Sequence, residues 1–294
     1  MKKYDNYVIG QIQVDYDEYP DGTVKTLIGG PFMFTAYAAI SSGRHVSGVC
    51  KIAEKDAYLA QAVYIHDLTV LPSKETTSLH VIYHSEDRER RSTVLKGIAD
   101  PVTTDDIPDD IESDVYQLAG VMRGQVDNDL FEYLSKRGKL ACDLQGFLRC
   151  PEGETLAYRD WEEKKKYLPY VTYLKLDAME AEITTGLTDR REAAKLIHSW
   201  GAKEVLITHN SEALVYDGQK FYACPLRPRN LSGRSGRGDS TFGSYITERS
   251  QRTIEESLVY ASALVSLKME TYGAFRQTRH DVEEYIKQFY AEYC

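Results

Sequence analysis

The second half of the chain shows a regular succession of hydrophobic patterns. Short apolar runs predict strands, and apolar positions three or four residues apart predict helices. The strands are expected at residues 139–144, 170–175 and 204–208, and the helices at residues 127–137, 161–168 and 177–185. A further helix is expected to begin at a capping box of Asp189 and Glu192 and to end at Gly201. Strands that alternate with helices predict an α/β fold with a mostly parallel central sheet and helices on both faces.

The first part of the chain contains polar strands that fall outside this alternation. Residues 7–15 begin apolar and then alternate, which predicts a strand that leaves a buried sheet and ends near Asp15. The polar stretch that follows carries a turn signal at Pro20, Asp21 and Gly22, and it therefore predicts a hairpin.

A second hairpin is expected over residues 77–84 and 91–98, which flank a charged turn. Two such hairpins, contributed by about residues 11–28 and 77–105, would form a small projecting sheet, and sheets of this kind often serve as lids. An exposed edge of this lid could also support a homodimer. We expect residues 1–294 to form a single α/β domain with a small β-sheet lid.

Composition narrows the classes of function. The formal net charge of −9 disfavours nucleic acid and anionic membranes as partners. We find neither a signal-peptide core nor an apolar run long enough to span a bilayer, so a cytoplasmic protein is expected. The five cysteines form no C-x-x-C pair and suggest neither a disulfide framework nor a zinc site. An acidic protein can still bind a polyanion through backbone N–H groups, a metal and a few cations.

A glycine-rich loop that runs into an apolar helical pattern is the most informative segment for chemistry. Gly236 and Gly238 allow successive N–H groups to converge at a helix N-terminus and to hold an anion. Asp239 follows them and could accept a proton from a bound hydroxyl group, which is one requirement of phosphoryl transfer. Alternatively, Asp239 could simply cap the helix, and taken alone this interpretation is about equally favoured. The chain contains no Walker-type P-loop.

These residues resemble a signature of the ribokinase-like, or PfkB, carbohydrate kinases, in which a D-T-x-G-A-G-D segment opens a helix. The residues from Ser235 to Asp239 match its second half. The resemblance implies that Gly236, Arg237 and Gly238 form an anion hole and that Asp239 is the catalytic base. Arg237 replaces the usual alanine and could add positive charge near the phosphates.

The second signature of this family is a glycine pair that opens a helix, and Gly29 and Gly30 match it in position. By this resemblance both glycines contact the acceptor, and Asp15 stands where the family has an aspartate that binds acceptor hydroxyls. Phe34 occupies the usual asparagine position and offers an aromatic face for stacking. The acceptor could therefore be a nucleoside instead of a sugar.

Other matches concern the phosphate and nucleotide region. Asp177 and Glu180 resemble the family's N-x-x-E segment, which organises the magnesium and phosphate region through water. Asp143 and Arg149 belong to a segment that resembles a D-x-Q-G-x-x-R variant of this family. The family's T-x-G-x-x-G nucleotide loop corresponds to residues 208–213, with Asn210 and Ala213 in place of its glycines. Thr208 and Asn210 are the nucleotide-binding residues that the resemblance implies.

The resemblance extends over nearly the whole chain, because its matches occur in the family's order. It implies ATP-dependent phosphorylation of a hydroxymethyl group on a sugar-like molecule, with Mg²⁺ as cofactor and ATP as co-substrate. No protein residue is assigned as a direct metal ligand. The alternatives are a nucleoside kinase and a non-catalytic ligand-binding or regulatory protein on the same fold, which the altered nucleotide loop suggests.

Overall fold

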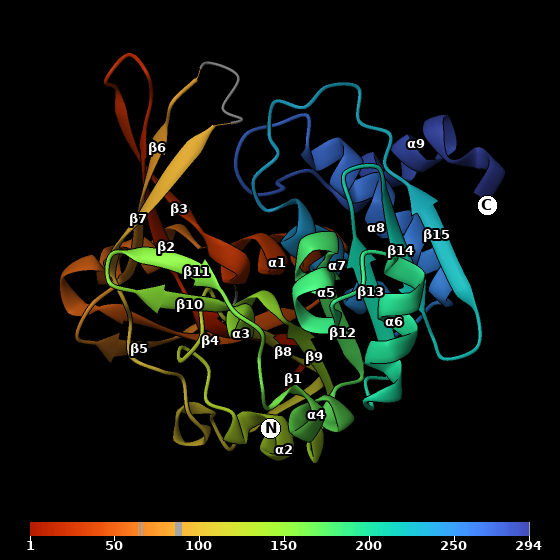
Figure 1. Cartoon of the computed structure of the whole chain (residues 1–294), viewed down its shortest axis with the longest axis horizontal. Helices are drawn as coiled ribbons and strands as arrows, with labels where there is room; N and C mark the ends of the chain where they lie inside the picture. Colours follow the sequence, from red (N-terminus) through yellow and green to blue (C-terminus); the bar gives the residue numbers. More distant parts are fainter. Residues whose placement is uncertain (64, 66, 86–89, 294) are drawn as a thin grey trace.

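Within residues 1–63, 65, 67–85 and 90–293, which the computed structural model describes, a nine-stranded sheet forms the centre of the molecule (Figure 1). Its strands, in spatial order, are β15 (Phe221–Pro225), β14 (Glu212–Tyr216), β13 (Glu204–Thr208), β12 (Tyr173–Asp177), β9 (Lys139–Asp143), β8 (Ile111–Ala119), β1 (Lys2–Gln11), β4 (Val46–Ala53) and β5 (Thr69–Ser73). The pairings are parallel except that β14 runs antiparallel to both β13 and β15.

Helices cover both faces of this sheet. One face carries α1 (Gly30–Ser41), α7 (Arg237–Glu248), α8 (Ile254–Lys268) and α9 (Arg279–Phe289). The other face carries α2 (Asp129–Ser135), α4 (Lys164–Tyr167), α5 (Ala178–Thr185) and α6 (Arg190–Ser199), and α3 (Gln145–Leu148) is a single short turn. Alternate strand residues supply the two cores: Val205 and Ile207 pack with the second set of helices, and Leu206 packs with the first.

A separate sheet projects beside the N-terminus of α1 (Figure 1). It consists of β2 (Gln13–Glu18), β3 (Val24–Gly29), β6 (Thr77–Tyr83) and β7 (Arg91–Gly97), with two antiparallel hairpins joined by the parallel pair of β2 and β6. The hairpin of β10 (Arg149–Glu152) and β11 (Thr155–Tyr158) leans on it, because Leu95 N–H donates to Glu154 C=O at 2.7 Å. We call the sheet of β2, β3, β6 and β7 the lid.

The architecture confirms the predicted fold class, with a mostly parallel sheet, helices on both faces and a small second sheet. The strand at 204–208 has the predicted bounds, and Asp189 caps α6 by accepting hydrogen bonds from the N–H groups of Arg191 and Glu192. Most of the charged turn expected between the lid hairpin strands falls on residues 86–89, outside the described residues. No helix in the described ranges is both long and apolar enough to cross a bilayer.

Two expectations about single elements were wrong. The strand expected over residues 7–15 is two strands, because the chain leaves the central sheet after Gln11 and β2 pairs within the lid. Asp15 therefore lies in the middle of β2 and not at a strand end. The helix expected over residues 161–168 shortens at both ends, because α4 begins only at Lys164 and is followed by a 3₁₀ turn (Leu168–Tyr170). At the second end, Pro169 has no N–H group to continue an α-helix.

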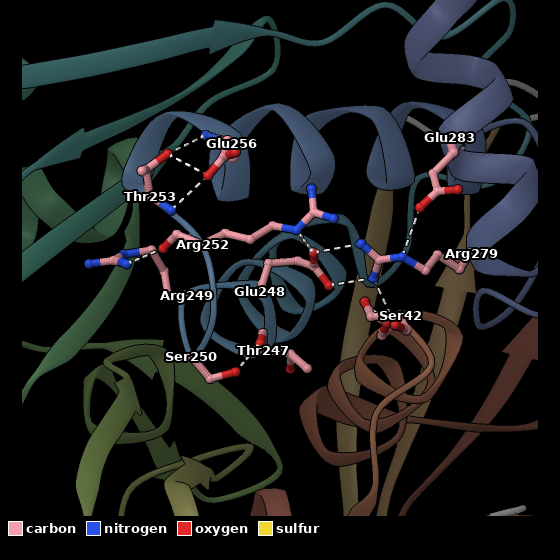
Figure 2. Close-up of polar contacts among 11 residues, drawn as sticks. Ser42, Thr247, Glu248, Arg249, Ser250, Arg252, Thr253, Glu256, Arg279 and Glu283 are labelled. Carbon is pink, nitrogen blue, oxygen red and sulfur yellow. Dashed lines mark hydrogen bonds and ion pairs between the residues drawn. The ribbon is translucent and has the colours of Figure 1, made fainter. Parts of the chain in front are cut away.

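A buried ion pair joins the start of α9 to the ends of α1 and α7 that lie opposite to the glycine motifs of these two helices (Figure 2). Glu248, at the end of α7, has an exposed fraction of 0% and accepts hydrogen bonds from Arg279 at 2.8 and 3.0 Å. Arg279 also donates to Ser42 C=O, which follows α1, at 2.8 Å. Arg252 approaches the same carboxylate from the surface at 3.0 Å. These contacts fix the relative positions of α1 and α7, whose other ends carry the glycine motifs.

We expect Arg279→Met to lower the free energy of unfolding by about 3 kcal/mol, because it leaves a buried carboxylate without its main partner. Urea denaturation followed by circular dichroism measures this loss. The matched control is Arg252→Met, which removes the more exposed partner of Glu248 and should cost less than about 1 kcal/mol. Equal losses in the two variants would contradict the role assigned to Arg279.

Candidate active site

The glycine pair at the start of α1 lies directly against strand β2 of the lid. A Cβ atom on Gly29 would stand 2.7 Å from Asp15 Oδ2, and one on Gly30, where φ is +84°, would stand 2.8 Å from Gln13 Cβ. Gln13 Nε2 donates to Asp15 Oδ1 at 2.5 Å. The positive φ of Gly30 favours glycine, and the missing side chain at Gly29 leaves room for the Asp15 carboxylate at the N-terminus of α1. The structure thus brings together Asp15 and both glycines, as expected.

A second glycine motif forms the N-terminus of α7. Gly236 is the N-cap residue with φ of +73°, and a Cβ atom there would stand 2.2 Å from the ring of Phe34. A Cβ atom on Gly29 would also contact this ring, at 3.7 Å. Phe34 therefore lies between the two glycine motifs, with an exposed fraction of only 8%. Stacking of a substrate base on Phe34 would require the ring to move away from Gly236.

Asp239 lies in the first turn of α7, but it does not act as a cap. Gly236 is the N-cap residue, and the Asp239 carboxylate has no hydrogen bond or ion pair to any described residue. Its backbone C=O accepts from Thr35 Oγ1 at 3.2 Å, which ties α7 to α1. Burial raises the pKa of the carboxyl group, and the positive charges of Lys175 and Arg149 oppose this rise. Because the half-buried Asp239 carboxylate forms no hydrogen bond to the described residues, it is available to accept a proton from a bound group.

Lys175 places a buried positive charge beneath this turn. It extends from β12 with an exposed fraction of 3%, and its Nζ lies 3.1 Å from Asp143 Oδ2 and 3.5 Å from Glu180 Oε2. A Cβ atom on Gly238 would stand 3.2 Å from Lys175 Nζ. Burial raises the pKa values of Asp143 and Glu180, and the ammonium group partly offsets both rises. The backbone at Gly238, in the turn at the start of α7, therefore lies close to the ammonium group of Lys175.

Asp177 and Glu180 form a reciprocal capping box at the start of α5. Glu180 N–H donates to Asp177 Oδ1 at 2.8 Å, and Asp177 N–H donates to Glu180 Oε2 at 2.7 Å. In the described parts of the chain no group of three or more His, Cys, Asp or Glu side chains could hold a metal ion. The half-buried Asp177 lines the cavity and could contact a magnesium ion carried mainly by phosphate and water oxygens, a mode that suits Mg²⁺.

The residues expected to bind a nucleotide, Thr208 and Asn210, line the same cavity close to the turn at the start of α7. Thr208 ends β13 and is buried, and Asn210 follows it. Arg237 Nη1 donates to Asn210 Oδ1 at 2.7 Å, so the arginine bridges the start of α7 and the loop after β13. The Arg237 side chain thus lies along the cavity wall, in the region where the phosphate donor is expected.

These elements enclose a cavity of about 530 Å³. Its charged lining consists of Lys175, Asp177, Arg234, Arg237, Asp239 and Lys268. Tyr83 of the lid also lines it and stacks on Tyr19 with ring centroids 5.5 Å apart, and the Tyr19 hydroxyl lies 2.9 Å from that of Tyr272. The lid therefore contributes Tyr83 to the wall of the cavity. Asp15, Gly29, Gly30 and Phe34 are not part of this lining, although the Phe34 ring packs against Gly236, which is.

Sequence reasoning gave no role to Lys175 or Lys268. Each had a visible signal, because a lysine interrupts the apolar run of β12 and another ends the apolar helix α8. A lysine at such a position needs a buried acceptor. Glu180 is close to Lys175 in sequence, but Asp143 lies 32 residues from Lys175, and Gly233 and Ser235 lie 35 and 33 residues from Lys268, so the sequence alone did not reveal these partners.

A family model and a curated relative both match most of the chain. A model of the pfkB family carbohydrate kinases matches residues 6–279. A cytidine kinase from Thermococcus kodakarensis is 29% identical over 262 residues, which cover 86% of this chain and 91% of that protein.

Solved structures of kinases also match this chain over most of its length. A pyrophosphate-dependent kinase in the ribokinase family, complexed with a pyrophosphate analog and myo-inositol, is 33% identical with a TM-score of 0.85, and the match covers 95% of this chain and 99% of that chain. Arabidopsis thaliana ribokinase complexed with ribose and ATP has a TM-score of 0.78 at 17% identity, over 98% of this chain and 99% of that one, and so shares the fold.

Proposed function

The chain belongs to the pfkB family of carbohydrate kinases, and on this basis we propose that it phosphorylates a hydroxymethyl group of a sugar-like molecule, with ATP as donor, Mg²⁺ as cofactor and Asp239 as general base. One observation carries the proposal. The Asp239 carboxylate lies at the cavity, beside a helix N-terminus, with no hydrogen bond or ion pair to any other described residue. The non-catalytic alternative finds no support, because the chain is a kinase by its family.

In the proposed reaction, Asp239 accepts the proton of the acceptor hydroxyl as its oxygen attacks the terminal phosphorus of the donor. The bond from that phosphorus to the leaving phosphate oxygen breaks in the same step. The N–H groups of Gly236, Arg237 and Gly238 form the anion hole for the transferred group, and the Arg237 N–H must leave Arg234 C=O, to which it donates at 3.3 Å. Lys175 lies beneath Gly238, and its positive charge is partly offset by Asp143 and Glu180. A bound magnesium ion would neutralise charge on the donor phosphates, near Asp177.

The acceptor side supports a small polyhydroxylated molecule. Asp15 presents a carboxylate beside Gly29 and Gly30, and a carboxylate accepts hydrogen bonds from neighbouring hydroxyl groups. The relatives include a kinase crystallised with myo-inositol and a cytidine kinase, so a cyclic polyol and a nucleoside are both suitable test acceptors. The packing of Phe34 against Gly236 favours the sugar-like acceptor over the nucleoside.

A second donor, pyrophosphate, is supported by a specific observation. The cavity is lined by four cationic side chains, and Arg237 holds Asn210 in the loop where the family's nucleotide glycines are replaced. Such a lining suits a compact polyanion better than a purine ring, which needs an apolar slot. The kinase that is 33% identical is pyrophosphate-dependent.

Initial rates for a matrix of donors and acceptors test the proposal. Mg-ATP and Mg-pyrophosphate would each be combined with ribose, fructose, myo-inositol, glycerol and cytidine, and the release of ADP or phosphate would be compared with and without acceptor. We expect acceptor-dependent turnover, with a sugar or polyol exceeding cytidine by at least about tenfold in kcat/KM, as expected for a site built to bind hydroxyls. Turnover only with cytidine would contradict the acceptor class, and turnover only with pyrophosphate would replace ATP as donor.

A further inference from the structure

The ammonium group of Lys268 is buried among backbone carbonyls at the floor of the cavity. Its side chain has an exposed fraction of 0%, and Nζ donates to Gly233 C=O at 2.8 Å and also to Ser235 C=O. Among the residues that the structure describes, no carboxylate lies within ion-pair distance of Nζ. A buried charge normally has a carboxylate partner. The ammonium group of Lys268 therefore forms its hydrogen bonds with backbone carbonyls of the loop of residues 233–235.

This loop is fitted closely to the end of α8, where Lys268 is the last helical residue. Gly233 N–H donates to Met269 C=O at 2.7 Å, and a Cβ atom on Gly233 would stand 1.6 Å from the Thr271 oxygen. A cation at a helix C-terminus is also favoured by the helix dipole. Three hydrogen bonds thus hold the loop of residues 233–235 against the C-terminal end of α8.

The direction of the held carbonyls determines the direction of the neighbouring N–H groups. In a planar trans peptide the C=O of one residue and the N–H of the next point in opposite directions. With the Ser235 oxygen on Lys268, the N–H of Gly236 points away from the lysine, and it is the first N–H of the turn at the start of α7. The ammonium also polarises this peptide, which strengthens the N–H as a donor.

We propose that Lys268 is a positioning residue that acts as a built-in monovalent cation, because its ammonium holds the carbonyls of Gly233 and Ser235 and thereby aims the anion-hole N–H groups at the phosphoryl group. The proposal rests on the proposed kinase function. Backbone carbonyls are also the usual ligands of alkali ions. The tethered ammonium would thus make the enzyme independent of added K⁺.

Lys268→Ala removes the cation and leaves a space lined by carbonyls, whereas Lys268→Met removes the charge and keeps the space filled. We expect both variants to lose about 10²-fold in kcat, because a misaligned anion hole stabilises the transition state less well. We expect K⁺ or ammonium at 100 mM to restore Lys268→Ala by at least tenfold over choline at equal ionic strength. Lys268→Met should not respond, and wild type should give the same rate in all three salts.

A second readout does not depend on activity. The melting temperature of Lys268→Ala, compared in potassium and choline chloride, should rise in potassium, because an ion that binds only the folded site stabilises it. Wild type and Lys268→Met should show no such difference. This readout separates the cation site from the kinase function. A potassium-dependent shift in a protein with no kinase activity would support the cation site and contradict the proposed kinase function.

The pH profile gives a third test. Burial lowers the pKa of Lys268 to about 8, and the negative charge of Asp239 opposes this shift. The elements packed against Nζ contribute Asp239 from α7, the neutral ring of Phe34 from α1 at 5.2 Å, and the loop carbonyls. Wild-type kcat/KM should therefore fall as the pH rises through about 8. Potassium-rescued Lys268→Ala should lose this fall.

Several outcomes would overturn the proposal. It fails if Lys268→Ala keeps wild-type kcat in choline, or if a folded Lys268→Ala responds to no cation in rate or melting temperature. It also fails if wild type is activated several-fold by K⁺, since its site would then not be filled. That last comparison needs no variant and applies even if Lys268→Ala does not fold.

Discussion

Replacing Asp239 by Asn is expected to lower kcat by about 10³-fold, which is within the range for loss of a general base. The substitution keeps the shape of the side chain and removes its ability to accept the proton of the acceptor hydroxyl. The affinity for the donor should stay the same or increase, because a negative charge beside the phosphates is lost. Steady-state kinetics with the best donor and acceptor, together with donor titration by calorimetry, measure both effects.

The matched control for this variant is Asp189→Asn, which makes the same chemical change at the N-cap of α6. Its carboxylate accepts from two backbone N–H groups and lies at the surface, so its loss should affect stability and leave kcat within about twofold. If Asp239→Asn were as active as Asp189→Asn, Asp239 could not be the base.

Gly236→Ala should have the second largest effect, with a loss of about 10²-fold in kcat/KM, because a small displacement of the anion hole misaligns the reacting groups. The residue has a φ of +73°, and its new Cβ would stand 2.2 Å from the ring of Phe34. Either the ring or the turn must therefore move. Kinetics would be compared with the free energy of unfolding of the same variant.

Two further variants separate backbone strain from displacement. Gly186→Ala, at φ of +75° with open space around the Cβ position, carries the same strain without a clash and should keep wild-type kcat/KM. Adding Phe34→Leu to Gly236→Ala removes part of the obstructing ring and should recover about tenfold. An equal kinetic loss in Gly186→Ala, or full activity in Gly236→Ala, would contradict the role of the turn.

The sequence predicted the parts of the fold whose patterns are local. Short apolar runs bounded by glycine or capping residues gave β13 and α5, and the turn signal near Gly22 gave the first lid hairpin. The strands β4, β5 and β8 were not predicted, although β4 and β8 flank β1 in the sheet. Their neighbours are distant in sequence, and such pairings leave no local signal. The break between β1 and β2 was also missed, since it reflects a change of sheet and not of pattern.

The candidate site shows the same division. Glycine pairs and a following acidic residue can be recognised as motifs, because close backbone approach permits only glycine. The motifs therefore gave Gly29, Gly30, Gly236, Gly238 and Asp239, which the structure gathers around Phe34 and the cavity. The motifs could not give the ion pair of Lys175 with Asp143 or the carbonyl partners of Lys268, since these depend on which segments meet in space. The packing of Phe34 against Gly236 also depends on tertiary structure.

The most direct test of the central claim is to follow phosphorus through the reaction by ³¹P NMR. Wild-type protein would be incubated with Mg²⁺, the preferred donor and the preferred acceptor, and a parallel sample would contain Asp239→Asn. We predict a new phosphate monoester signal that grows one for one with donor consumption in the wild type and is nearly absent in the variant. Consumption of donor to inorganic phosphate alone, or equal ester formation by both proteins, would contradict phosphoryl transfer with Asp239 as base.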